Sequence, residues 1–209
     1  MKKLIKYILL AFVIILLGYN AVYVKKLSEV LKGEKQEFDA ASFTKKIWNE
    51  KMPAKITSAV DLSILIKEVE ADKEVALKKY TNALAIGNYR YALIKTQAVV
   101  TEVKDDEVLL QIVNGNNLLN ATLTTEYVYG NAVRDASGLI DIKDFPNTSN
   151  LNAVSEEMNN LVRTTVVPAF KKTVKKGDKI TVTAALELNK EHLKWNDIEL
   201  IPVSIQTIQ

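Results

Sequence analysis

The hydrophobic positions of the chain begin with an unbroken apolar run over residues 7–24, which contains no charged residue and has lysines on both sides. As a helix, the run is about 27 Å long, which spans the hydrocarbon core of a thin bilayer. Apolarity on every face, with tyrosines near both ends, is typical of a transmembrane helix. The pattern predicts an anchor over 7–24, preceded by a cytoplasmic tail (1–6) and followed by a juxtamembrane linker (25–37).

A cleaved leader and a lipoprotein leader would also begin with lysines and an apolar run. Cleavage requires small residues at positions −3 and −1, and the pairs Leu16 with Gly18 and Tyr19 with Ala21 do not provide them. Lipid attachment requires a cysteine after the small residue, and here Gly18 is followed by Tyr19. We therefore expect an uncleaved single-pass anchor in the cell membrane, with the bilayer as a partner and the following domain on the extracytoplasmic side.

Residues 38–87 show the spacing of amphipathic helices. Asp39, Asp61 and Asp72 each precede an apolar stripe, in the position that an N-cap residue occupies. The first stripe ends near Pro53, which should stop a helix. The pattern predicts a helical subregion of two to three short helices over 38–87.

From Tyr89 the hydrophobic period changes from that of a helix to the alternation of strands. Residues 89–103 are apolar on both faces, so both faces of this strand should be partly covered. Turn-forming residues separate the strands that follow. The expected order is strand 89–103, turn 104–107, strand 108–113, turn 114–117 and strand 119–129.

The C-terminal part begins with an irregular stretch over 130–150. An amphipathic helix is expected from Leu151 to Val162, and Pro168 should terminate or kink it. A turn at 175–179 then leads to strands at 180–188 and about 194–205. Three strands, a helix and two strands are the order of a five-stranded OB-type barrel. The predicted fold class is α+β: an anchor, a short helical region and an OB-like barrel over 88–209, with 38–209 as one compact domain.

Length and charge narrow the class of protein. With 209 residues, the chain holds one anchor and one domain with a substantial core. The formal net charge is +3, but residues 1–32 carry six lysines and one glutamate, so the remainder is near neutral. Such a domain lacks the positive field that attracts polyanions, and we expect no nucleic-acid partner. The absence of cysteine excludes disulfides, cysteine-ligated metals and thiol nucleophiles.

Four stretches of the chain point to a family: "FDAASFTKKIWNEK", "VDLSILIKEVEADKEVALKKY", "GNAVRDASGLIDIKDFPN" and "VSEEMNNLV". Together they resemble a bacterial domain-of-unknown-function family described as predicted periplasmic lipoproteins. The most specific element is Gly130-x-Ala132-x-Arg134-Asp135 followed by Asp144-Phe145, with Trp48 as a second marker.

The resemblance implies an envelope location, an OB-like domain and frequent gene neighbourhood with sugar-uptake ABC transporters. A subunit of such a transporter, or its solute-binding protein, is therefore an expected partner. The family carries no established activity that could be transferred. This chain departs from the lipoprotein description at Tyr19, where a lipidated cysteine would stand.

Candidate catalytic groups are few. His192, the single histidine, lies in an expected loop, and no metal cluster can be built around it. The pair Asp105-Asp106 lies in a turn, and Glu156-Glu157 is expected in the first turn of a helix, where the helix dipole favours carboxylates. We expect no catalysis and no cofactor. An envelope hydrolase that uses carboxylates and an oligonucleotide-binding OB domain remain alternatives.

Arg134, Asp135 and Trp48 are the candidate residues for binding a ligand or a partner. Neighbouring Arg and Asp residues are not expected to pair with each other, so each needs a loop, a helix end or a ligand. Trp48 serves either as a packing anchor or as a stacking surface for a sugar. The sequence as a whole predicts a membrane-anchored extracytoplasmic accessory or binding protein. The family resemblance implies that it is associated with a sugar ABC transport system.

Overall fold

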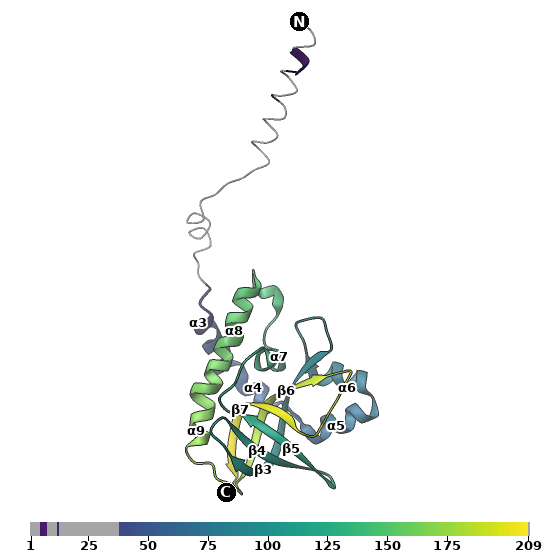
Figure 1. The fold of residues 1–209 in the computed structure, drawn as a ribbon, viewed down its shortest axis with the longest axis vertical. Helices are drawn as coiled ribbons and strands as arrows, with labels where there is room; N and C mark the ends of the chain where they lie inside the picture. The colour runs from purple at the N-terminus through teal and green to yellow at the C-terminus, as the bar shows by residue number, and fades with distance from the viewer. Residues whose placement is uncertain (1–4, 8–11, 13–37, 209) are drawn as a thin grey trace. The chain divides into compact units, whose positions relative to one another are not determined.

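The computed structural model describes residues 5–7, 12 and 38–208 of the chain, and residues 39–209 form a compact unit (Figure 1). Within the described ranges, no helix is both long enough and apolar enough to cross a membrane. Apart from Tyr7 and Phe12, the predicted anchor over 7–24 lies outside the described residues.

Four helices occupy the region where two to three were expected: α3 (Ala40–Glu50), α4 (Met52–Thr57), α5 (Leu62–Ala71) and α6 (Lys73–Tyr80). The three predicted N-caps are confirmed. Asp39 accepts a hydrogen bond from the Ser42 amide, Asp61 from the Ser63 amide and Asp72 from the Val75 amide, at 3.0, 2.8 and 3.1 Å. Pro53 was expected to stop the first helix, and α3 does end just before it. Pro53 itself lies in the first turn of α4, where a missing N–H breaks no helical hydrogen bond.

The sheet has two short strands, β1 (Val60–Asp61) and β2 (Thr81–Asn82), and five long ones. The long strands are β3 (Tyr89–Val103), β4 (Glu107–Asn114), β5 (Asn117–Thr124), β6 (Lys179–Asn189) and β7 (Ile198–Ile208). Their pairings run from β3 through β4, β5, β7 and β6 and return to β3, so they form a closed ring. The β5–β7 pairing is parallel and short, and the others in the ring are antiparallel.

The expected order of three strands, a helix and two strands is confirmed, with two differences at strand ends. The third strand ends at Thr124 instead of Tyr129, because the amides of Thr125 and Glu126 bond to the Asp106 carbonyl and turn the chain away. The last strand begins at Ile198, four residues later than expected, after a loop with Asp197 at positive φ.

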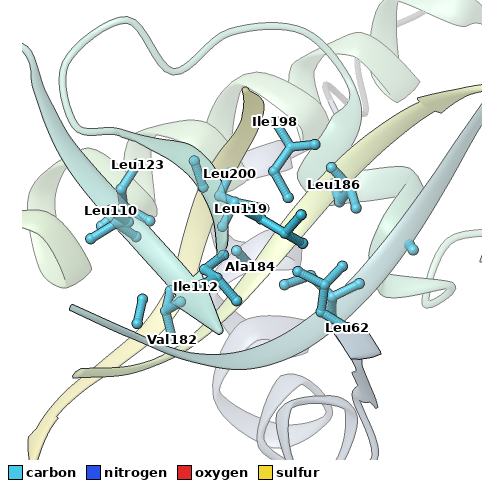
Figure 2. Packing of buried hydrophobic residues seen from close by; sticks show 14 of the residues in the cluster. Leu62, Leu110, Ile112, Leu119, Leu123, Val182, Ala184, Leu186, Ile198 and Leu200 are labelled. Carbon is cyan, nitrogen blue, oxygen red and sulfur yellow. The ribbon is translucent and has the colours of Figure 1, made fainter. Parts of the chain in front are cut away.

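The ring surrounds the main hydrophobic core, part of which is shown in Figure 2. Side chains of α5 and α6, and Phe170 and Val174 near the end of the last helix, join this core. On β3, Ala92 and Ile94 are fully buried, while Tyr91 and Leu93 on the opposite face are 7% exposed. The prediction that β3 is covered on both faces is therefore confirmed.

The segment 130–150, expected to be irregular, contains helix α7 (Ala132–Ser137), which ends at Gly138 in the left-handed conformation, and a 3-10 turn (Ile142–Asp144). Helix α8 (Thr148–Leu161) then runs on through a π-helical turn (Val162–Val166) into α9 (Val167–Lys171). Pro168 interrupts the α-helical hydrogen bonding but does not end the helical path. In Figure 1, α8 and α9 flank one side of the strands, and α5 and α6 flank the other.

Candidate functional site

Helix α7 carries Arg134 and Asp135 and packs against β3, β6 and α8. Every residue of this six-residue helix is buried. Its short length gives it little stability of its own, so its position depends on these neighbours. The two charged side chains are therefore held inside the protein, between the strands and α8.

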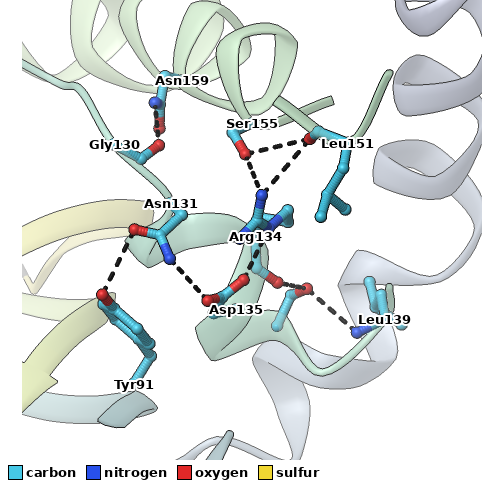
Figure 3. Close-up of polar contacts among 10 residues, drawn as sticks. Tyr91, Gly130, Asn131, Arg134, Asp135, Leu139, Leu151, Ser155 and Asn159 are labelled. Carbon is cyan, nitrogen blue, oxygen red and sulfur yellow. Dashed lines mark hydrogen bonds and ion pairs between the residues drawn. The ribbon is translucent and has the colours of Figure 1, made fainter. Parts of the chain in front are cut away.

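Arg134 and Asp135 pair with each other, contrary to the expectation that adjacent residues would not. Arg134 Nε lies 2.7 Å from Asp135 Oδ1, and the two residues are 5% and 1% exposed (Figure 3). The expectation was wrong because the arginine bonds through Nε, the inner nitrogen of its guanidinium, which lies within reach of the short Asp135 side chain. Pairing inside the protein offsets the large cost of removing both charges from water.

Further hydrogen bonds connect this ion pair to its neighbours (Figure 3). Asn131 Nδ2 donates to Asp135 Oδ2 at 2.7 Å, and the Tyr91 hydroxyl donates to Asn131 Oδ1 at 3.3 Å. On the other side, Arg134 Nη1 donates to Ser155 Oγ at 2.9 Å. The network thus joins β3, α7 and α8.

Arg134 also lines an open cleft of about 420 Å³ beside α8. Its Nε and Nη1 groups have partners, but Nη2 has no hydrogen-bond partner among the described residues. The Arg134 guanidinium is therefore held by three contacts on a residue that lines the cleft. The lining residues are Val128, Tyr129, Gly130, Asn131, Arg134, Asn152, Ser155, Glu156, Asn159 and Arg163.

Arg163, on the π-helical turn, is the second cation of the cleft. Its Nη1 donates to the Val128 carbonyl, and its guanidinium lies 5.9 Å from the centre of the Tyr129 ring. Asn159 donates from Nδ2 to the Gly130 carbonyl at 2.8 Å. Its Oδ1 is buried and has no hydrogen-bond partner among the residues that the structure describes.

Sequence reasoning found Arg134 but missed the polar side chains that α8 and the π-helical turn bring to the cleft. The missed residues lie at spacings of three, four, seven and eleven from Asn152, which places them on one face of the helical path. This polar stripe runs beside the apolar stripe of the same helix, so the sequence alone could have indicated a polar face here. It consists of Asn152, Ser155, Glu156, Asn159 and Arg163.

Trp48 does not line the cleft. It is half-buried on α3, a helix that packs against α8. The structure therefore does not bring Trp48 and Arg134 into one site, and a binding role for Trp48 stays a prediction.

The structure places the two carboxylate pairs on α8 and in the turn between β3 and β4. Glu156 and Glu157 lie in the middle of α8, not in its first turn as expected, because the helix begins at Thr148. Asp105 is exposed in the turn between β3 and β4, and His192 is exposed in the loop after β6. Over the described part of the chain, no group of three or more His, Asp or Glu side chains could hold a metal ion.

Tyr91 provides a pH-dependent test of the network. Burial, and then the charge of Glu187, raises the pKa of Tyr91 from 10.0 to about 12. Because the folded-state pKa is raised, its contribution to stability is complete below about pH 10 and is lost as the pH rises towards 12. We expect the unfolding free energy of Tyr91→Phe to fall less steeply across this window than that of the parent, measured by urea denaturation at each pH. Equal slopes would contradict the assignment.

Comparison with solved structures gives the class of protein. The chain is similar to an OB-fold protein of Thermotoga maritima, with 23% sequence identity and a TM-score of 0.71. The match covers 82% of this chain and 99% of the other. At this identity the similarity shows the fold alone, which is an OB fold of mixed α and β elements.

The family follows from the sequence match. Residues 12–206 match the family model described as "Predicted periplasmic lipoprotein (DUF2291)", and the chain belongs to that family. The predicted resemblance is thus confirmed, and membership indicates an envelope-associated, extracytoplasmic protein. A search of curated proteins finds no match.

Proposed function

We propose that this protein is a non-catalytic binding or accessory protein of the bacterial envelope, and that the cleft beside α8 is its binding site. The observation that supports this proposal is the state of Arg134. Three groups hold its side chain, the residue lines the cleft, and Nη2 has no hydrogen-bond partner among the described residues. An arginine held in this way can offer its remaining N–H groups to a ligand without losing the contacts that position it.

The lining of the cleft favours binding over hydrolysis. Hydrolysis by carboxylates commonly requires two of them, as in the glycosidases, where they flank the scissile bond. Glu156 is the single carboxylate among the lining residues, and it is exposed. No observation on the described residues supports the hydrolase or the oligonucleotide-binding alternative.

The proposal includes an uncleaved anchor over residues 7–24 and a ring of strands that acts as an OB-type barrel outside the cell membrane. It also includes a sugar ABC transporter subunit, or its solute-binding protein, as the partner. The anchor rests on the sequence pattern, and the partner rests on the family resemblance.

Site-specific photo-crosslinking in intact membranes tests the function. A crosslinker placed at Asn152, on the rim of the cleft, is expected to capture the transporter subunit or the solute-binding protein. The same group at Asn160, exposed on α8 but outside the cleft lining, is the matched control and should capture neither. Equal capture from both positions, or no capture where known complexes are recovered, would contradict the proposal.

A further inference from the structure

The chemistry of the cleft indicates which ligand it takes. Building on the proposed function, we infer that the cleft binds a small monocarboxylic acid that carries hydroxyl groups. Three features of the lining carry this inference: its charge, its free donors and its unsatisfied amide.

The charges favour a single negative charge on the ligand. Arg134, Arg163 and Glu156 line the cleft, and Asp135 pairs with Arg134 behind it. Arg163 therefore supplies the positive charge without a paired carboxylate in the described network. A ligand with two negative charges would meet additional repulsion from Glu156.

The free donors suit a carboxylate. Arg134 Nη2 has two N–H groups and no partner among the described residues. Over the same residues, Arg163 forms a hydrogen bond through Nη1 alone. Guanidinium N–H groups bond strongly to planar carboxylates. Because its other contacts already hold Arg134 in place, ligand binding costs little additional side-chain entropy.

The unsatisfied amide indicates hydroxyl groups on the ligand. Asn159, a residue of the cleft lining, is 4% exposed, and its buried Oδ1 has no donor in the described part of the chain. A buried acceptor without a donor destabilises the empty state, and a hydroxyl is a suitable donor. Asn152 adds an exposed amide to the same lining, and an acid with a purely apolar tail would offer neither asparagine a hydrogen-bond partner.

Isothermal titration with three matched probes tests the ligand class. D-glucuronate carries a carboxylate and hydroxyls, glucose has the hydroxyls without the carboxylate, and hexanoate has the carboxylate without the hydroxyls. We expect glucuronate to bind the full chain about tenfold more tightly than either of the others.

Substitutions that change the charge at the rim of the cleft test whether glucuronate binds there. Glu156→Gln should strengthen glucuronate binding about threefold to tenfold, and Asn152→Asp should weaken it by a similar factor. Both positions are exposed, so neither change should disturb folding. Glu157→Gln and Asn160→Asp make the same chemical changes on α8 outside the cleft lining, and should leave the affinity within about twofold.

The outcomes separate the ligand class from the proposed function. Equal affinity for glucose, equal affinity for hexanoate, or no binding of glucuronate overturns the ligand class. Binding that responds equally to the rim changes and their controls overturns the location. If crosslinking from Asn152 still captures the partner in these cases, the proposed function stands without this ligand.

Discussion

Arg134→Met is expected to lower the free energy of unfolding by about 3–5 kcal/mol, because it leaves the Asp135 carboxylate buried without its cation. The carboxylate side chain is 0% exposed and would keep one hydrogen bond, from Asn131. Ser155 Oγ would also lose the hydrogen bond from Arg134 Nη1. Urea denaturation followed by circular dichroism measures the change.

Two further variants separate the loss of the ion pair from a general effect of losing arginine. Arg163→Met removes a half-buried guanidinium that bonds to one carbonyl, and should cost only about 1 kcal/mol. The double variant Arg134→Met/Asp135→Leu removes both charges and should recover part of the loss. A double variant less stable than Arg134→Met would show that the uncompensated carboxylate is not the cause.

Leu200→Ala is expected to destabilise the fold by about 2–5 kcal/mol, through lost burial and the cavity that remains. Leu200 is 0% exposed and pairs in register with Leu123 on β5 and Leu186 on β6, both also buried (Figure 2). It lies where the ring closes through only three register pairs between β5 and β7. A cavity here therefore weakens the shortest pairing of the ring.

Ile201→Ala, one residue further along β7, is the matched control for this position. Ile201 is half-buried on the opposite face of the strand, so its truncation should cost about 1 kcal/mol or less. Thermal and urea unfolding of both variants test the difference. Equal losses would show that the interior of the ring is not the main source of stability at this strand.

The sequence predicted those parts of the fold that depend on local patterns. Asp39, Asp61 and Asp72 cap helices because a short side-chain oxygen before an apolar stripe is a local signal. The strands followed from the period-two alternation, and their order predicted the OB-type arrangement that the structural similarity shows. Strand ends were less accurate, since the bond from the Thr125 amide to Asp106 connects residues 19 positions apart.

The candidate site was predicted only in part, because its geometry depends on contacts between distant segments. Arg134 and Asp135 were found, but α7 was not expected, since six residues carry too little pattern to reveal a helix. The cleft itself forms from residues 128–134 and from α8 and its π-helical extension. No local signal places these two segments together, although the polar stripe on α8 marks the face that one of them presents.

The burial of β3 on both faces limits how this protein can diversify. Tyr91, Ala92, Leu93 and Ile94 are consecutive buried residues, so a change at any of them affects one of two separate packing layers. Substitutions that accumulate during evolution in this half of the strand should therefore be limited to apolar side chains of similar volume. New specificities are then left to arise on the loop after β5 and on α8, where side chains can vary without disturbing the scaffold.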